Sequence, residues 1–433
     1  MAPESEPQRA SHRRLSPSVL VALMGAVGIL TVGMLASRPD VIVVGLPLAL
    51  WAVYAISAQP PSGVIAIEIE RGMEPADGWL AEEIVIRSDA EMVEAAVIQA
   101  ERTRRRVFVS GDTRLRARSR VLHSGPLISV ELAVRPLEAD SAVIGAPQSP
   151  ITAIRAVTPV IQRIPRMPIA PRLTGLHGAH EGMRPGQGGD FRDIHQFAPG
   201  DELRRVDWKA TARAARRPGE LLIRRNNTLS DASAVIVMDT ADDLGTVVAT
   251  WGTLDLESSG VTSLDHARGA ARSIAAATIA QGDRIAFHTL MHGGRSVRSG
   301  GGTRHLARVV AEISACGRGG DDARFRRTPP VPHGSIIYVL STFFDGAAAE
   351  IALRWRAVGH RVIAVDTLPE LDTHRLGKER QLALRVLLTE RQDMLHQLRE
   401  SGVETLGWRD APAGQLAALA RVGAHSPRMG AQR

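Results

Sequence analysis

Two apolar runs near the amino terminus constrain this chain more than any other feature. Val19–Ala36 and Val41–Ala58 each contain 18 residues without a charge, and only Ser37-Arg38-Pro39-Asp40 separates them. A helix needs about 20 apolar residues to cross the hydrocarbon core of a bilayer, so both runs are just long enough. A polar turn between two such runs predicts a transmembrane helical hairpin over residues 19–58, after a tail of residues 1–18.

A cleaved signal peptide is the alternative for the first run, which follows Arg13 and Arg14. A second apolar run comes almost at once, however, and a secreted protein would not need it. The basic residues before the first run outnumber the single Arg38 in the turn, where Asp40 lies beside it. By the positive-inside rule the amino terminus stays cytoplasmic. We therefore expect a cell-membrane protein with two spans and a cytoplasmic body.

Residues 62–160 change to short runs in which apolar side chains alternate, as in Val64–Ile69 and Leu127–Leu132. Such runs, broken by Gly, Pro and Asp, predict a β-rich, sandwich-like domain. Four arginines alternate on one of these runs and should share one strand face, namely Arg114, Arg116, Arg118 and Arg120. One interpretation is a solvated sheet face, and the other is contact with anionic membrane lipids.

The net charge of +7 comes almost entirely from arginine, and acidic residues are interspersed through most of the chain. This mixing argues against nucleic acid as a partner. Cys316 is the only cysteine, so no internal disulfide is expected. It ends an apolar helical pattern, which indicates a small buried residue at a helix end rather than a nucleophile.

One segment carries an ordered pattern that is more informative than any single residue. A Pro-Gly-Asp turn signal is followed closely by Arg, Asp-Trp and Ala-Arg. This order resembles the signature of the domain of unknown function 58 family. The matching positions are Pro199, Gly200, Asp201, Arg204, Val206, Asp207, Trp208, Ala212 and Arg213. They lie in residues 161–232, which we expect to combine a linker with this signature.

The signature has two physical interpretations. Asp207 and Arg213 are close enough to pair, and Trp208 offers a large apolar face. The segment is then either a buried ion-pair clasp against the following domain or a docking surface for a partner. No nucleophile, base and oxyanion hole follow one another in sequence order. We therefore predict no catalytic or cofactor-binding residues, and we do not expect an enzyme.

Residues 233–410 alternate buried-type strands with helices, and residues 411–433 are expected to form a tail. Continuous apolar runs such as Val235–Met238 and Ile336–Leu340 are typical of parallel strands covered on both faces. The alternation predicts an α/β domain with helices on both faces of a parallel sheet. It resembles a von Willebrand factor A domain, here preceded by the hairpin and the β-rich domain.

That resemblance implies a divalent-cation site at the carboxyl ends of the strands, built from Asp-x-Ser-x-Ser, a threonine and a later aspartate. In this chain Asp239 is kept, Ala241 and Asp243 replace the serines, and Thr303 is the candidate threonine. The final aspartate position appears as Thr342. A hard cation needs oxygen ligands, and part of that shell is lost. We therefore expect a degenerate site that no longer holds Mg²⁺.

The family resemblance also implies a partner, an AAA+ ATPase of the MoxR type. The leading prediction is a membrane-anchored interaction module, an adaptor or regulator for such an ATPase in envelope-related or complex-assembly work. The alternative is a divalent-metal-dependent ligand receptor that uses the partly degenerate site at Asp239, Asp243 and Thr303.

Overall fold

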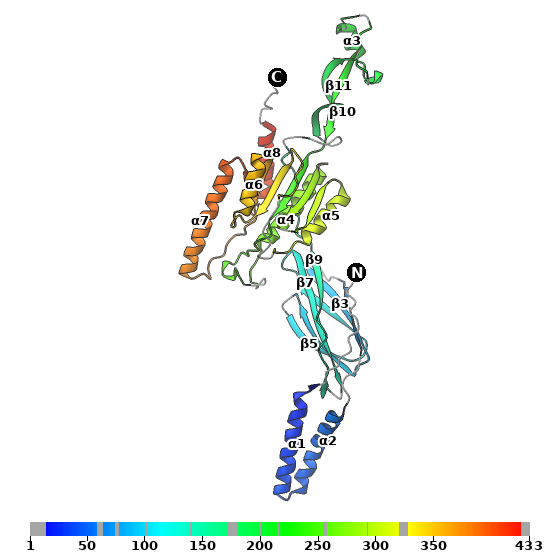
Figure 1. Ribbon diagram of the computed structural model, residues 1–433, viewed down its shortest axis with the longest axis vertical. Coiled ribbons are helices and arrows are strands. Elements are labelled where there is room, and N and C mark those ends of the chain that lie inside the picture. The colour runs from blue at the N-terminus through cyan, green and yellow to red at the C-terminus, as the bar shows by residue number, and fades with distance from the viewer. Residues whose placement is uncertain are drawn as a thin grey trace. The chain divides into compact units, whose positions relative to one another are not determined.

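The computed structural model describes residues 14–58, 64–73, 78–100, 103–138, 141–170, 173, 180–199, 201–214, 216–217, 219–253, 258–291, 293–319 and 328–425. The chain forms two compact units (Figure 1). The first comprises Met1–Leu122 and Leu127–Arg155, and the second comprises His123–Pro126 and Ala156–Arg433. Each is described by itself.

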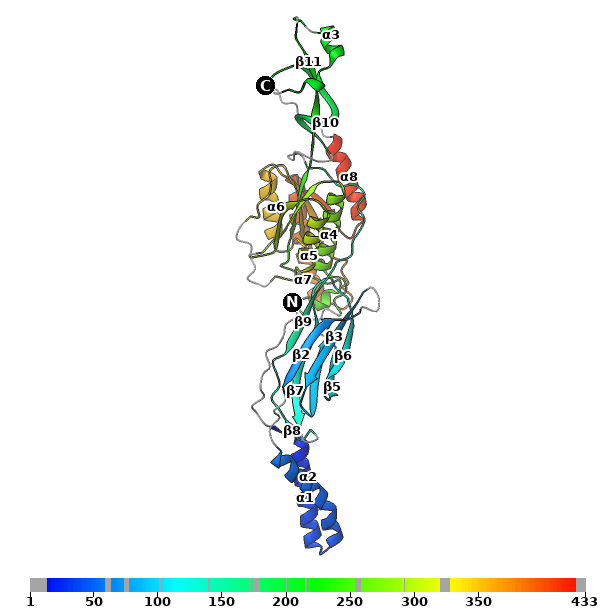
Figure 2. The same ribbon diagram turned by 90° about the vertical axis from the view of Figure 1, so that its right-hand side faces the viewer.

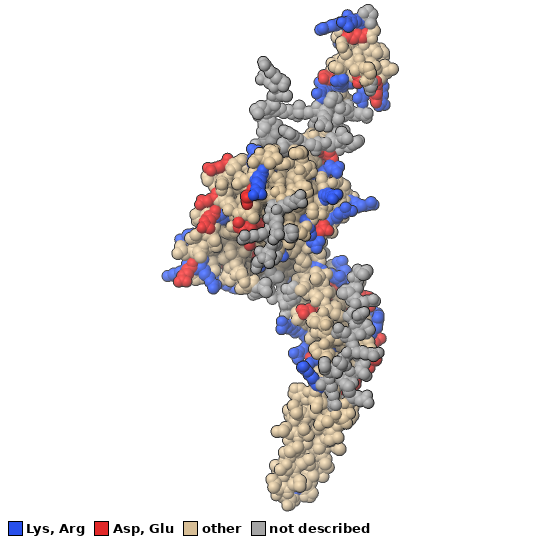
Figure 3. Space-filling model, in the orientation of Figure 1, with Lys and Arg blue, Asp and Glu red and all other residues tan. Residues whose placement is uncertain are grey.

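The first unit begins with two helices that are long and apolar enough to cross a membrane, α1 (Pro17–Leu35) and α2 (Pro39–Ser57). A proline starts each helix, where its missing N–H costs nothing. Most side chains on these helices are exposed, which differs from the core helix of a soluble protein, and Figure 3 shows almost no charge on their surface. The predicted pair of apolar helices is confirmed.

Close approach of the two helices depends on small residues. A Cβ on Gly33 would lie 2.7 Å from Ile42 Cγ1, and a Cβ on Gly45 would lie 3.2 Å from Leu30 Cγ. Glycine is therefore needed at Gly33 if the backbones are to keep this distance. At the turn between the helices, Arg38 Nη2 and Asp40 Oδ2 form an ion pair of 2.8 Å.

The hairpin is joined to the β-rich part by pairing and packing. The short strand β1 (Arg14–Leu15) pairs with β8 (Val143–Ile144), and the Ser16 N–H donates to Ala142 O at 2.8 Å. A small buried cluster then joins both helices to β8 through Val19, Ala55, Ala142 and Val143.

The β-rich part is a pair of sheets that share one apolar core, as the alternating pattern predicted. One sheet contains β2 (Ile65–Arg71), β3 (Trp79–Ser88) and β6 (Thr113–Arg120), and Figure 2 shows these three strands side by side. The other contains β1, β8, β7 (Gly125–Glu138), β4 (Met92–Gln99), β5 (Thr103–Val109) and β9 (Ile151–Val157). Alternate isoleucines and valines of both sheets form the core between them.

The four alternating arginines of β6 are all exposed on one face, as predicted. The neighbouring strand places acidic residues among them: Glu83 lies opposite Arg116, and its Oε1 is 3.9 Å from Arg114 Nη1. The arginine face is therefore partly neutralised by its own sheet.

The second unit is built on a six-stranded sheet with the order β14-β13-β12-β15-β16-β17. Five strands are parallel and the edge strand β14 is antiparallel. The bounds are β12 Ser233–Met238, β13 Arg284–Thr289, β14 Ser296–Gly300, β15 Ile336–Ser341, β16 Arg361–Asp366 and β17 Glu404–Gly407. The strands expected from the continuous apolar runs Val235–Met238 and Ile336–Leu340 are confirmed as β12 and β15, whereas β14 and β17 lack such runs and were not predicted.

Helices cover both faces of this sheet. Buried residues of α4 (Ser263–Ala280), α5 (Thr303–Ser314) and α8 (Pro412–His425) pack on one face. Those of α6 (Ala347–Ala357) and α7 (Lys378–Glu400) pack on the other. The region predicted as a carboxyl-terminal tail thus contains α8, whose Leu416 is fully buried.

Residues 161–170, which belong to the segment expected to contain a linker, are partly packed. Ile164, Met167 and Ala170 are buried in the core beside α4, and the Gln162 N–H donates to Ser273 Oγ at 2.9 Å. Local composition gave no sign of this, because the stretch has no helical or strand period and its partners are over 100 residues away.

Candidate functional site

The family signature forms the outer end of a two-stranded extension. β10 (His180–Gln196) pairs with β11 (Leu222–Ser230) in antiparallel fashion, and Gln196 lies opposite Leu222. The chain between these two residues contains the 3-10 turn η1 (Leu203–Arg205) and the short helix α3 (Trp208–Ala214). We call residues 191–225 the signature tip.

Carboxylates hold the backbone of the signature tip in place. Asp201 Oδ2 accepts the Ala198 N–H at 2.8 Å and closes the turn after Pro199. Gly200 lies outside the described residues. Asp207 Oδ1 accepts the Ala210 N–H at 2.9 Å, in the manner of a helix N-cap, and the Asp207 N–H donates to Leu222 O at 2.8 Å. The two aspartates of the signature therefore stabilise the turn and the start of α3 by accepting backbone N–H groups.

The interpretation of this segment as a buried clasp is wrong. Trp208 is 67% exposed, and Arg213 is also exposed on the last turn of α3. Asp207 caps the helix instead of neutralising Arg213. The small buried core of the signature tip consists of Val206, Leu222 and Ile223, and the side chains of Arg204, Trp208 and Arg213 face solvent.

A cavity of about 530 Å³ opens on the signature tip beside Trp208. Its lining includes the guanidinium side chains of Arg204, Arg205 and Arg224, together with Asp207. Arg224 lies over the ring of Phe191, with its Cζ 5.2 Å from the centroid. The side chain of Arg204 is 75% exposed, and Glu202, which pairs with it at 2.5 Å, has its pKa lowered by that hydrogen bond. Figure 3 shows basic side chains beside uncharged surface on this extension.

A second polar group lies at the carboxyl edge of the α/β sheet, where a cation site was considered. Ser341 Oγ donates to Asp239 Oδ2 at 2.7 Å, and the Ala241 N–H donates to Asp239 Oδ1 at 3.0 Å. Thr342 Oγ1 donates to Asp242 Oδ2 at 3.2 Å. Asp242, which sequence reasoning passed over, therefore takes the place beside Asp239.

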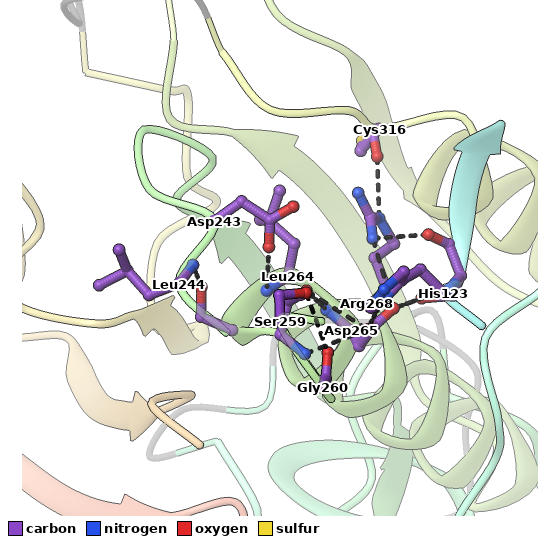
Figure 4. Close-up of polar contacts among 12 residues, drawn as sticks. His123, Asp243, Leu244, Ser259, Gly260, Leu264, Asp265, Arg268 and Cys316 are labelled. Carbon is purple, nitrogen blue, oxygen red and sulfur yellow. Dashed lines mark hydrogen bonds and ion pairs between the residues drawn. The ribbon is translucent and has the colours of Figure 1, made fainter. Parts of the chain in front are cut away.

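The other two predicted ligands lie elsewhere. Asp243 Oδ1 points to the Leu264 N–H at the start of α4, at 3.4 Å (Figure 4). Thr303 follows β14, which runs antiparallel and places Gly300 opposite Ile285 at the beginning of β13. Because Asp239 follows the end of β12, Thr303 lies at the opposite edge of the sheet.

Burial raises the pKa of Asp239 to about 6, against hydrogen bonds from Ser341 and Ala241, and the charges of Asp345 and Asp242 raise it further. Burial likewise raises the pKa of Asp242. Among the described residues, no group of three or more His, Cys, Asp and Glu side chains is placed to hold a metal ion. Each oxygen of Asp239 already accepts one hydrogen bond, so a cation at this carboxylate would share its oxygens with Ser341 and the Ala241 N–H.

A buried arginine side chain lies at the carboxyl ends of the neighbouring strands β15 and β16. Arg391 of α7 is buried, donates from Nε to Thr342 O at 2.5 Å and forms an ion pair with Asp366. Its Cζ lies 5.5 Å from the centroid of the Phe344 ring. This arginine, which no local pattern singled out, places a fixed positive charge at the carboxyl ends of β15 and β16.

The start of α4 carries a third polar network (Figure 4). Asp265 accepts hydrogen bonds from Thr262 in a capping box, from Ser124 N at 2.7 Å, and pairs with His123 Nδ1 at 2.7 Å. The buried Arg268 donates to Ser124 O and to Cys316 O, both at 2.8 Å. Burial raises the pKa of the Cys316 thiol to about 12, which agrees with the prediction of an unreactive residue at a helix end.

The fold and these sites define a mixed α/β protein with a pair of apolar helices near its amino terminus and an exposed aromatic and basic extension. Residues 193–395 match the family described as protein of unknown function DUF58, and this part of the chain belongs to that family. The match begins in β10 and ends in α7, so it includes residues 193–225 of the signature tip and the polar residues Asp239, Asp242, Ser341 and Arg391. A comparison with curated proteins found no match.

Proposed function

We propose that this chain is a membrane-anchored, non-enzymatic interaction protein whose signature tip is its docking surface. The observation that carries the proposal is the exposure of Trp208 and Leu203, 67% and 66%, next to the basic Arg204. Water-exposed tryptophan beside arginine is the composition of protein–protein binding hot spots. A tryptophan kept for stability alone would be packed.

The α/β unit supports the same proposal. We propose that this unit is a von Willebrand factor A-like domain, and its mainly parallel six-stranded sheet with one antiparallel edge strand supports that assignment. Such a domain would present the signature tip on a rigid base. The groups that sequence reasoning considered for chemistry are occupied in structural hydrogen bonds, as Asp239 is by Ser341, or buried, as the Cys316 thiol is. This favours binding over catalysis.

The anchor follows from α1 and α2, which we propose to span the cell membrane with the remainder of the chain in the cytoplasm. Arg118 and Arg120 on β6 lie opposite Ala81 and Trp79 rather than opposite acids, so they are the arginines of that face best suited to lipid headgroups. We propose a MoxR-type AAA+ ATPase as the protein partner, because the family resemblance implies one.

Affinity capture of the full chain in lipid nanodiscs tests the docking proposal. The chain is incubated with a purified MoxR-type ATPase from the same genome, with ATP, with ADP and without nucleotide. We expect nucleotide-dependent capture that Trp208→Ala reduces at least tenfold. The matched control is Trp79→Ala, since Trp79 is also exposed, at 39%, but lies on β3. Capture that neither nucleotide nor Trp208→Ala alters would overturn the proposal.

The metal-dependent receptor is the weaker candidate. It rests on Asp239 and Asp242, whose raised pKa values would fall if a cation bound. Isothermal titration of the chain with Mg²⁺ tests it: saturable millimolar or tighter binding that Asp239→Asn abolishes would favour the receptor over the docking module.

A further inference from the structure

The signature tip has an excess of positive charge. Its basic residues are Arg192, Arg204, Arg205, Lys209, Arg213, Arg216, Arg217, Arg224 and Arg225, and its acidic residues are Asp193, Asp201, Glu202, Asp207 and Glu220. More positive than negative charge is left for a partner, because the acidic and the basic side chains of the tip have different contacts.

Three of the five carboxylates of the signature tip bind its own backbone, whereas Glu202 pairs with Arg204 and Arg205, and Asp193 pairs with Arg192. Asp201 and Asp207 accept N–H groups of the turn and of α3, and Glu220 Oε2 accepts the Arg216 and Arg217 N–H groups at 2.7 and 3.1 Å. Their negative charge is thus spent on fixing the fold of the tip. Within the described part of the chain, no carboxylate pairs with the exposed side chains of Lys209 and Arg213.

The cavity beside Trp208 concentrates this charge. Three arginines, Arg204, Arg205 and Arg224, line a concave space of about 530 Å³ together with Trp208. The position of Arg224 is fixed by its contact with the Phe191 ring. Guanidinium groups bind carboxylates in bidentate geometry, and several of them around one cavity favour a discrete anion.

We infer that the signature tip binds an acidic segment of a partner protein, with an Asp or Glu carboxylate in the cavity between Arg204, Arg205 and Arg224 and an apolar side chain against Trp208. This inference rests on the proposed function, since it assigns the partner chemistry to the same docking surface. The lining of the cavity also includes Asn226, whose side-chain amide suits the polar groups of a peptide backbone. A peptide can place a carboxylate between the arginines and an apolar side chain against Trp208 at the same time, which favours a peptide over a lipid headgroup.

A phage-displayed library of random dodecapeptides, selected on the full chain in nanodiscs, tests the inference. We expect the selected peptides to be enriched in Asp and Glu together with an apolar residue. The affinity of a selected peptide should fall at least tenfold in the double variant Arg204→Glu/Lys209→Glu, and it should fall as salt rises. Both substituted side chains are exposed, so the fold should be retained, which thermal unfolding checks. Arg385→Glu, at an exposed arginine of α7, is the matched control.

Selected peptides without acidic enrichment, or an equal affinity for the double variant, would overturn the inference, as would failure to select any peptide that depends on the signature tip. A third outcome would also overturn the inference: no peptide is selected, the unchanged chain binds anionic vesicles, and the double variant does not. That result would assign the surface to lipid. This experiment and the ATPase capture can fail separately. If the ATPase is captured through Trp208 but the selected peptides are not acidic, only this inference is rejected. If the selected peptides are acidic but the ATPase is not captured, only that partner is rejected.

Discussion

The hydroxyl of Ser341 donates a hydrogen bond of 2.7 Å to the buried carboxylate of Asp239, although 102 residues separate them in the chain. The two residues end neighbouring parallel strands, β12 and β15, and the Asp239 N–H also donates to Leu340 O at 2.8 Å. The Ser341 hydroxyl is thus the hydrogen-bond partner of Asp239 Oδ2, a place that water or a cation would otherwise take. Four consequences of this and related contacts can be measured.

Asp239→Asn should stabilise the folded chain at pH 7.5. Burial holds the pKa of Asp239 at about 6, above its ordinary value of 3.8, so the charged form is disfavoured by folding. A raised pKa means that this group favours folding at low pH and that the benefit is lost as the pH rises through 6. Removing the charge should gain about 1–3 kcal/mol at pH 7.5 and almost nothing at pH 4. Urea denaturation at both pH values measures it; the exposed Asp393→Asn is the control, and an unchanged or lower stability at pH 7.5 contradicts the prediction.

Asp265→Asn should have the opposite pH dependence. Burial alone would raise the pKa of Asp265, but hydrogen bonds from His123 and Ser124 and the charge of His123 leave it below its ordinary value. A lowered pKa contributes stability above pH 3.8, which is lost as the pH falls through the folded-state pKa. We expect a loss of about 1–3 kcal/mol at pH 7 that narrows below pH 4. An equal loss of unfolding free energy at pH 7 and below pH 4 would contradict the prediction. It would show that the neutral capping hydrogen bonds of Asp265, and not its charge, stabilise the start of α4.

Arg391→Leu should destabilise the α/β unit. The substitution removes the partner of Asp366 and leaves Thr342 O without its donor in a buried place. Breaking one side of a buried pair costs about 3–5 kcal/mol, and we expect the lower half of that range because Asp366 is partly exposed. Urea denaturation followed by tryptophan fluorescence measures it, with the exposed Arg385→Leu as the control. Equal midpoints for the two variants would refute the assignment.

Gly33→Leu should separate the two amino-terminal helices, whereas Gly28→Leu should not. A Cβ at Gly33 meets Ile42 at 2.7 Å, but nothing lies within 4 Å of one at Gly28. Overpacking of this kind costs about 1–3 kcal/mol. Disulfide trapping between cysteines introduced at Leu30 and Gly45 in membranes reports the separation, because these two residues are in contact across the hairpin. Equal trapping in both variants would argue that the helices do not pack as described.

Local patterns in the sequence were sufficient for the elements that depend on nearest neighbours in the chain. The apolar helices at Pro17–Leu35 and Pro39–Ser57 follow from uninterrupted hydrophobicity, and the central strand Ser233–Met238 follows from a short continuous apolar run. The exposed arginine face of β6 follows from strict alternation. Each of these patterns has a period that the backbone geometry of a helix or strand fixes directly.

The candidate site depended on contacts that no local pattern specifies. The resemblance to a von Willebrand factor A domain predicted Asp243 and Thr303 beside Asp239. The loop after β12 instead turns Asp243 to α4, and the reversal of β14 carries Thr303 to the other edge of the sheet.

The sequence by itself determined the family, the apolar hairpin and the alternation of strands and helices, because each is a property of residues close together in the chain. Only the tertiary structure decided that Asp242, Ser341 and Arg391 share the strand ends and that Trp208 faces solvent. The physical reason is that strand order and register bring together side chains about 100 residues apart, and burial depends on which surfaces those strands leave uncovered.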